Sequence, residues 1–304
     1  MSQLAKPRTI AIVAPSGYAA DPAAFQRGLE RLRALGHTVK DLSATANKHQ
    51  RFAADDAARL AQLHAAARDP EVEIVIALRG GYGLSRLLPD IDFALLAASG
   101  KRWVGHSDFT ALQMGLLAQG AASFAGPMIC DDFSRDELSE FTHAHFWSCL
   151  NQSTLVLEVA ASGNPTLQAR GKLWGGNLAI LSHLAGTPWM PAIEAGILFI
   201  EDINEHPYRV ERMLLQLWHA GVLKNQRAIL LGDFSGYKLT DYDNGYDFAA
   251  MAAWLSERIG LPILQGLPFG HIRDKVTLPV GADCTLNSDA KGFRLELSAY
   301  PHLD

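Results

Sequence analysis

The sequence has few cysteines, no excess of basic residues and no long apolar run. Its 304 residues include three cysteines, Cys130, Cys149 and Cys284, whose scattered spacing matches neither a disulfide framework nor a metal site. The formal net charge is -5 at pH 7, so no basic field exists to attract nucleic acid or acidic lipid. No apolar run approaches the roughly 18 residues that span a bilayer. We therefore expect no metal, no nucleic-acid partner and no membrane partner.

The start of the chain lacks the pattern of a targeting segment. Its opening residues are polar, reading MSQLAKPRT, and lead directly into an apolar strand-like run at 10–14. A signal peptide would place a longer apolar stretch there. Together with cysteines that form no disulfide pattern, this favours a reducing, cytoplasmic location.

What the chain does contain is enough apolar sequence for two folded units. Hydrophobic residues make up 48% and charged residues 19%, which is typical of a globular protein. A length of 304 residues suits two domains better than one core. The stretch 151–170 is polar and carries Gly/Pro punctuation. We therefore predict an N-terminal domain over 1–150, a linker over 151–170 and a C-terminal domain over 171–304.

Short apolar runs alternate with helix-like segments in both halves of the chain. In the first half, strand-like runs occur at 9–14, 38–39, 74–78 and 102–104, with amphipathic stretches between them. This alternation predicts a Rossmann-like parallel sheet covered by helices. The second half repeats the pattern and ends in a tail that alternates apolar and polar residues, typical of antiparallel hairpins. The predicted fold class is therefore α/β, with a smaller C-terminal α/β domain that carries hairpins.

The stretch 101–117 has the pattern of a strand, a tight turn and a helix, reading KRWVGHSDFTALQMGLL. Gly105 leaves room for a sharp bend, and Ser107 follows where the turn points a hydroxyl toward solvent. The backbone N–H groups after Ser107, beginning with Asp108, have no helical partner and can stabilise an oxyanion. We interpret Ser107 as a nucleophile. The alternative is that Ser107 or Asp108 simply caps the helix.

A glycine-rich loop, R-G-G-Y-G at 79–83, follows the strand-like run IVIAL. It lacks both G-x-G-x-x-G spacing and a G-K-S/T loop, so no nucleotide cofactor is expected. Its glycine pair lets backbone N–H groups approach a substrate closely, although a flexible turn explains the pair equally well. Arg79 is a candidate to bind a free carboxylate with its guanidinium, the alternative being a surface or structural ion pair.

Two further polar residues follow apolar strand-like runs in the second half. Glu201 ends the run GILFI, and His271 follows Gly270 in a Pro/Gly loop. A nucleophilic serine needs a base such as histidine, and that histidine needs a carboxylate to fix its tautomer. The order Ser, Glu, His is one that a serine hydrolase can adopt. With 11 histidines and 32 acidic residues, however, many such triples can be drawn.

Six short motifs, taken together and in order, resemble the LD-carboxypeptidase family. They are P-S-G at 15–17, R-G-G-Y-G at 79–83, G-H-S-D at 105–108, G-x-L-W-G-G-N at 171–177, F-I-E-D at 199–202 and G-H at 270–271. Each motif alone is weak, but the set extends from residue 15 to residue 271 and so covers most of the chain.

The resemblance implies a cytoplasmic, metal-independent serine peptidase that removes the terminal D-alanine from a murein tetrapeptide in peptidoglycan recycling. It carries Ser107 over as nucleophile, His271 as general base and then acid, and Glu201 as the residue that orients His271. The backbone N–H groups of Gly81 and Asp108 would form the oxyanion hole. The family also implies an active site between two α/β domains, no cofactor and a homodimer.

Trp174 is a candidate to line the peptide groove, with buried packing as the alternative. Two other functions remain open. One is a microcin C-like self-immunity peptidase of the same superfamily, although the compact chain shows no longer loop that would stack an adenine ring. The other is a non-catalytic α/β module that binds a sugar or nucleotide. Labelling of Ser107 by a serine reagent separates an enzyme from such a module.

Overall fold

The computed structural model describes residues 6–43 and 47–304. Its strands are β1 (Thr9–Val13), β2 (Thr38–Asp41), β3 (Ile74–Ala77), β4 (Arg102–Gly105), β5 (Ser123–Ala125), β6 (Leu155–Ala160), β7 (Leu167–Asn177), β8 (Ile197–Glu201), β9 (Ala228–Leu231), β10 (Ile263–Gln265), β11 (Leu278–Val280), β12 (Asp283–Asp289) and β13 (Gly292–Ser298). Its α-helices are α1 (Pro22–Ala34), α2 (Asp56–Arg68), α3 (Leu84–Leu87), α4 (Phe93–Ala98), α5 (Thr110–Ala118), α6 (Glu140–Asn151), α7 (Leu178–Leu184), α8 (Pro207–His219) and α9 (Phe248–Ile259).

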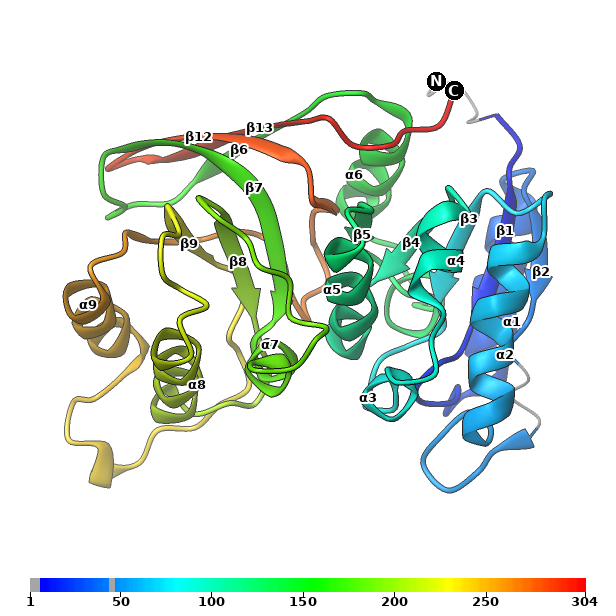
Figure 1. Ribbon diagram of the computed structural model, residues 1–304, viewed down its shortest axis with the longest axis horizontal. Coiled ribbons are helices and arrows are strands. Elements are labelled where there is room, and N and C mark those ends of the chain that lie inside the picture. The colour runs from blue at the N-terminus through cyan, green and yellow to red at the C-terminus, as the bar shows by residue number, and fades with distance from the viewer. Residues whose placement is uncertain (1–5, 44–46) are drawn as a thin grey trace.

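Within the described residues the strands form two sheets, one of six strands and one of seven. Figure 1 shows the six-stranded sheet on the right and the seven-stranded sheet on the left, with α5 between them. Helices α7, α8 and α9 lie along one side of the seven-stranded sheet. The α/β class predicted from the sequence is confirmed.

The six-stranded sheet has the order β11-β5-β4-β3-β1-β2 and is parallel except for the edge strand β11. Strands β1 and β3 are almost entirely buried runs of Ile, Val and Ala, as expected for a parallel sheet covered on both faces. Because β3 and β4 are neighbours, the loop at 79–83 and the turn at 105–108 leave the sheet side by side. The sheet order thus brings two of the sequence motifs together.

The seven-stranded sheet has the order β10-β9-β8-β7-β12-β13-β6. Strands β7 to β10 are parallel, whereas β6, β12 and β13 pair antiparallel, and β12 and β13 form the hairpin predicted for the tail. Strand β7 belongs to both parts, because its first residues pair with β12 and its last five pair with β8. The pairing places Asn177 directly opposite Glu201.

The segment 151–170, predicted from the sequence as a linker between domains, is largely strand. It contains β6 and the first residues of β7, and both strands belong to the seven-stranded sheet. The side chains of β6 alternate between buried and exposed positions at its start, which gives the segment its polar texture. The Gly/Pro punctuation falls only on the connection between the two strands.

The stretch 171–177, interpreted from the sequence as a glycine-rich turn, is the end of strand β7. A Cβ atom on Gly171 would lie 1.8 Å from the carbonyl oxygen of Ala195. A Cβ atom on Gly175 would lie 1.9 Å from the carbonyl oxygen of Phe199. Glycine is therefore needed here because neighbouring backbone approaches closely, and no turn is involved.

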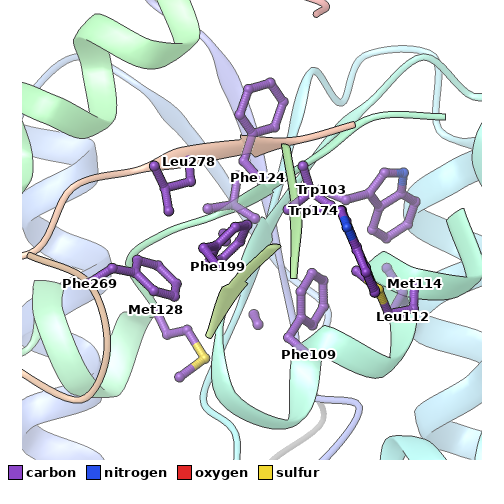
Figure 2. Packing of buried hydrophobic residues seen from close by; sticks show 14 of the residues in the cluster. Trp103, Phe109, Leu112, Met114, Phe124, Met128, Trp174, Phe199, Phe269 and Leu278 are labelled. Atoms are coloured by element: carbon purple, nitrogen blue, oxygen red, sulfur yellow. The ribbon is translucent and has the colours of Figure 1, made fainter. Parts of the chain in front are cut away.

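The two sheets share one buried hydrophobic cluster. Strand β11 comes from the C-terminal part of the chain, yet it pairs with β5 at the edge of the first sheet. Figure 2 shows Phe124 of β5, Leu278 of β11, Phe199 of β8 and Phe269 in this cluster. The rings of Phe199 and Phe269 meet edge to face, with centroids 5.3 Å apart. The loops that carry Ser107 and His271 are therefore held on a common core.

Candidate active site

Ser107 lies in a sharp turn directly after β4. Residues Ser107–Phe109 form one turn of 3-10 helix before α5 begins, where the sequence predicted a helix from Phe109. The φ angle of Ser107 is 59°, in the left-handed region that residues with side chains rarely adopt. A Cβ atom on Gly105 would lie 2.7 Å from Cγ of Phe109. Glycine at 105 therefore permits the tight approach of the turn to its strand.

The structure brings Ser107, His271 and Glu201 into direct contact. Nε2 of His271 lies 3.1 Å from Oγ of Ser107, and Nδ1 lies 2.7 Å from Oε2 of Glu201. The His271 side chain is 21% exposed, whereas the Glu201 side chain is fully buried. An imidazole between a hydroxyl and a carboxylate can accept the proton of the hydroxyl while the carboxylate holds its orientation.

The surroundings of His271 raise its pKa above the ordinary value. Burial alone would lower the pKa, but the hydrogen bond to Glu201 and the negative charge of Glu201 outweigh that effect. The charge of Asp131 raises the pKa further, and that of Lys275 lowers it. Since only the neutral imidazole can accept a proton, the site becomes competent as pH rises through this pKa.

The loop that carries His271 is fastened to the first half of the chain. Nζ of Lys275 donates to Oδ1 of Asp132 at 2.7 Å, and both side chains are buried. Oγ1 of Thr142 donates to the carbonyl oxygen of Arg273 at 2.8 Å and accepts from the backbone N–H of Lys275 at 2.9 Å. The histidine and the serine are thus both held by first-half residues.

Asn177 and Asp202 surround Glu201, and neither was assigned a role from the sequence. Nδ2 of Asn177 donates to Oε1 of Glu201 at 3.2 Å and to Oδ1 of Asp202 at 3.1 Å. Burial, with a further contribution from the charge of Glu201, raises the pKa of Asp202 to about 6. Both residues belong to the motifs at 171–177 and 199–202, so a signal for them was present.

The glycine loop packs against the Ser107 turn. A Cβ atom on Gly80 would lie 2.8 Å from Oγ of Ser107 and 3.4 Å from the backbone nitrogen of Asp108. Gly81 has a φ angle of 108°, which glycine adopts without strain. Gly81, Ser107 and Asp108 line one cleft. Both residues assigned to the oxyanion hole thus line the same cleft as Ser107, and the role of their N–H groups stays a prediction.

The two candidate substrate contacts, Arg79 and Trp174, have different surroundings in the structure. Within 6–43 and 47–304, no carboxylate lies within 4.0 Å of the Arg79 guanidinium, so the ion pair considered from the sequence is absent there. Nη1 of Arg79 donates to the carbonyl oxygen of Tyr18 at 3.4 Å. Trp174 is buried, and its Nε1 donates to Gln226 at 2.9 Å. Trp174 therefore packs in the core and does not line a groove.

A cleft of about 210 Å³ opens beside Ser107. It is lined by Gly81, Tyr82, Ser107, Asp108, Asn177, Ile180, Asp202, Ile203 and His271. These residues come from both halves of the chain. The cleft is smaller than the roughly 300–1,000 Å³ typical of sites that enclose a drug-sized ligand, so it suits a single residue-sized group.

In the described part of the chain, no three or more His, Cys, Asp or Glu side chains are grouped so that they could hold a metal ion. None of the helices there has the length and apolar content needed to cross a bilayer.

Known proteins match the chain over most of its length. The family model for the LD-carboxypeptidase N-terminal domain matches residues 10–126, and that for the C-terminal domain matches residues 170–286. The "Probable murein peptide carboxypeptidase" of Bacillus subtilis (strain 168) is 32% identical over 297 residues, which is 96% of this chain and 93% of the relative.

Solved structures match equally broadly. A crystal structure of muramoyltetrapeptide carboxypeptidase from Oxalobacter formigenes is 54% identical, with a TM-score of 0.93, and covers 96% of this chain and 99% of that one. The microcin C7 self immunity protein MccF, in an apo active-site mutant, is 22% identical with a TM-score of 0.88 and 98% coverage of each chain. At that identity, the second match shows a shared fold only.

Proposed function

The chain belongs to the LD-carboxypeptidase family, and from this premise we propose that it is a metal-independent serine peptidase that removes the terminal D-alanine from murein tetrapeptide. The observation that carries the proposal is the continuous contact from Ser107 through His271 to Glu201, at 3.1 and 2.7 Å. The names of the relatives from Bacillus subtilis and Oxalobacter formigenes support a murein peptide as substrate.

The proposed reaction has two steps. Oγ of Ser107 attacks the carbonyl carbon that precedes D-alanine while Nε2 of His271 takes the hydroxyl proton. The backbone N–H groups of Gly81 and Asp108 stabilise the oxyanion, the C–N bond breaks, and His271 gives its proton to the departing amine. Water, activated by His271, then cleaves the acyl-serine ester and releases the tripeptide. Glu201 holds the imidazole orientation in both steps.

Arg79 is the proposed anchor for the carboxylate of the terminal D-alanine. Its Nη2 lies 3.9 Å from where a Cβ atom on Gly81 would stand, so the guanidinium is next to the glycine loop. Its Nε is buried without a hydrogen-bond partner among the described residues. A planar guanidinium with donors to spare matches a carboxylate through paired hydrogen bonds.

The proposal includes the setting that the family resemblance implies. We place the enzyme in the cytoplasm, in peptidoglycan recycling, and expect a homodimer. Light scattering coupled to size-exclusion chromatography tests the oligomeric state, because a chain of 33.0 kDa would then elute at about twice that mass.

The test of the function is incubation with murein tetrapeptide in the presence of EDTA, followed by mass spectrometry. We expect the wild-type protein to yield tripeptide and D-alanine, and Ser107→Ala to yield neither. Ser288→Ala is the matched control, since its hydroxyl only donates to the carbonyl oxygen of Pro165, outside the cleft. Release of D-alanine by Ser107→Ala would show that the nucleophile is another group.

A further inference from the structure

The side chain of Asp108 is buried behind the cleft, and the proposed reaction uses only its backbone N–H. It is 3% exposed. Its Oδ2 accepts hydrogen bonds from Oγ of Ser16 at 2.5 Å and from the backbone N–H of Leu84 at 3.0 Å. Within the described ranges its Oδ1 is buried without a partner. Burying such a carboxyl group costs free energy, so its retention beside a nucleophile calls for an explanation.

The two donors to Asp108 come from two different loops. Ser16 belongs to the P-S-G motif after β1, and Leu84 begins α3 directly after the glycine loop. Asp108 itself follows β4. Since β4, β3 and β1 are consecutive neighbours in the sheet, one carboxyl group joins the loops that leave three adjacent strands.

A second buried charged side chain holds the same two loops. The guanidinium of Arg59 is fully buried and donates to the carbonyl oxygens of Pro15 and Gly83. The loops are also in close contact, because a Cβ atom on Gly83 would lie 2.9 Å from Cα of Ser16. Burial raises the pKa of Asp108, and the nearby charge of Arg59 partly opposes that effect.

The glycine loop held in this way is the one that packs on the nucleophile. The backbone N–H of Gly17 donates to the carbonyl oxygen of Gly80 at 3.3 Å, and a Cβ atom on Gly80 would lie 2.8 Å from Oγ of Ser107. A shift of this loop would move the N–H of Gly81 relative to the reacting carbonyl. Catalysis by an oxyanion hole depends on donors that are already in place when charge develops.

We propose that the carboxyl group of Asp108 is a positioning group: by binding Ser16 and Leu84, it fixes the N–H donors of Asp108 and Gly81 relative to Ser107. The inference rests on the proposed function. In this arrangement the P-S-G motif has a role, because the Ser16 hydroxyl connects the loop after β1 to the Asp108 turn, which also binds the end of the glycine loop at Leu84.

Three variants test the proposal: Ser16→Ala, Asp108→Ala and Asp108→Asn. We expect kcat for D-alanine release to fall roughly tenfold in Ser16→Ala and roughly a hundredfold in Asp108→Ala, with KM changed by less than about twofold, since the lost interaction acts in the transition state. Asp108→Asn keeps an acceptor oxygen for Leu84, so its kcat should lie between those of wild type and Asp108→Ala.

Asn164→Ala is the matched control. The Asn164 side chain is also buried and joins its loop to the end of β10, donating to the carbonyl oxygens of Ala161 and Gln265 at 3.2 Å and accepting from the N–H of Gln265 at 2.8 Å. It is not part of the cleft. We expect this variant to lower Tm and leave kcat unchanged, which separates positioning from general loss of stability.

A second readout does not depend on the peptide. A fluorophosphonate reacts when Oγ of Ser107 bonds to phosphorus, fluoride leaves and His271 takes the proton, with the phosphoryl oxygen in the oxyanion hole. We expect the labelling rate constants of the variants to follow the same ranking as their kcat values. If the wild type is labelled but releases no D-alanine, the proposed substrate is wrong while the labelling rates still decide the role of Asp108.

Several outcomes would overturn the proposal. One is that the Ser16→Ala and Asp108→Ala variants fold and are labelled at the wild-type rate. Another is that KM rises in these variants while kcat stays unchanged. If Asp108→Ala does not fold, the rate constants of Ser16→Ala and Asp108→Asn test the proposal. A wild-type protein that is neither labelled nor active would overturn both this inference and the proposed function.

Discussion

At the scale of single residues, Glu201 controls how basic His271 is. Glu201 is fully buried, accepts from Nδ1 of His271 at 2.7 Å and accepts from Asn177 as well. Its hydrogen bond and charge are what reverse the lowering of the His271 pKa by burial. The carboxylate therefore sets both the tautomer of the imidazole and the pH at which it becomes neutral.

Glu201→Gln should move the acidic limb of the pH profile to lower pH. Without the charge, burial dominates and the pKa of His271 falls, so the imidazole is neutral at lower pH. We expect maximal kcat to fall by roughly 10³–10⁴-fold, because the amide no longer stabilises the imidazolium. The measurement is kcat/KM against pH, with Glu194→Gln as control, since the Glu194 carboxylate accepts from Asn225 and is not part of the cleft. An acidic limb that stays in place or moves upward would contradict the assignment.

Arg79→Met should weaken substrate binding rather than chemistry. A hydrogen-bonded charge pair contributes roughly 1.5–3 kcal/mol, so we expect KM for the tetrapeptide to rise about 10- to 100-fold. A tetrapeptide with a C-terminal amide lacks the carboxylate and should bind wild type and variant equally. Arg212→Met, at an exposed position on α8, is the control. Equal losses for acid and amide substrates would place the carboxylate elsewhere.

At the scale of elements, the position of His271 depends on a loop that crosses between the two sheets. Residues 271–275 lead from the second sheet into β11 of the first. The buried pair of Lys275 and Asp132 and the bonds to Thr142 fasten this loop to first-half elements. Such a pair contributes little net stability, but breaking it leaves one buried charge without a partner.

Lys275→Met should destabilise the protein by roughly 3–5 kcal/mol, because Asp132 is left buried and unpaired. The double variant Lys275→Met/Asp132→Leu should recover most of that loss. Lys275 also lowers the pKa of His271, so its removal should move the acidic limb to higher pH, opposite to Glu201→Gln. Denaturant unfolding and kcat/KM against pH measure the two effects. A double variant no more stable than the single one would contradict the account.

At the scale of the whole molecule, the two sheets are expected to unfold together. They share one hydrophobic cluster, and β11 completes the first sheet with residues from the far end of the chain. The candidate active site draws residues from both halves of the chain, so a protein that opened one sheet alone would lose the contact between Ser107 and His271. A shared core couples the stability of the site to that of the molecule.

Leu278→Ala tests this coupling, because Leu278 is fully buried in β11. Truncation of a buried leucine costs roughly 2–5 kcal/mol. We expect hydrogen-exchange protection to fall by the same amount in β3 and in β8. Val156→Ala, at a position 44% exposed on β6, should leave both unchanged. A loss confined to β3 would show that the sheets unfold independently.

The sequence determined the elements whose pattern is local. Apolar runs gave β1, β3 and β8 within about a residue, because a buried parallel strand needs continuous apolar side chains. The motif order identified Ser107, Glu201 and His271, which the structure places in contact.

Only the tertiary structure decided the features that depend on partners distant in sequence. Strand β6 looks polar until it pairs with β13 in the second sheet and the side chains on one of its faces become buried. The glycines of β7 resemble a turn until β8 and its preceding loop approach them. The burial of Trp174, the absence of an ion pair at Arg79 within the described residues and the crossing of β11 follow from packing. Composition and motif spacing do not predict these contacts, because each contact joins segments that meet only when the chain folds.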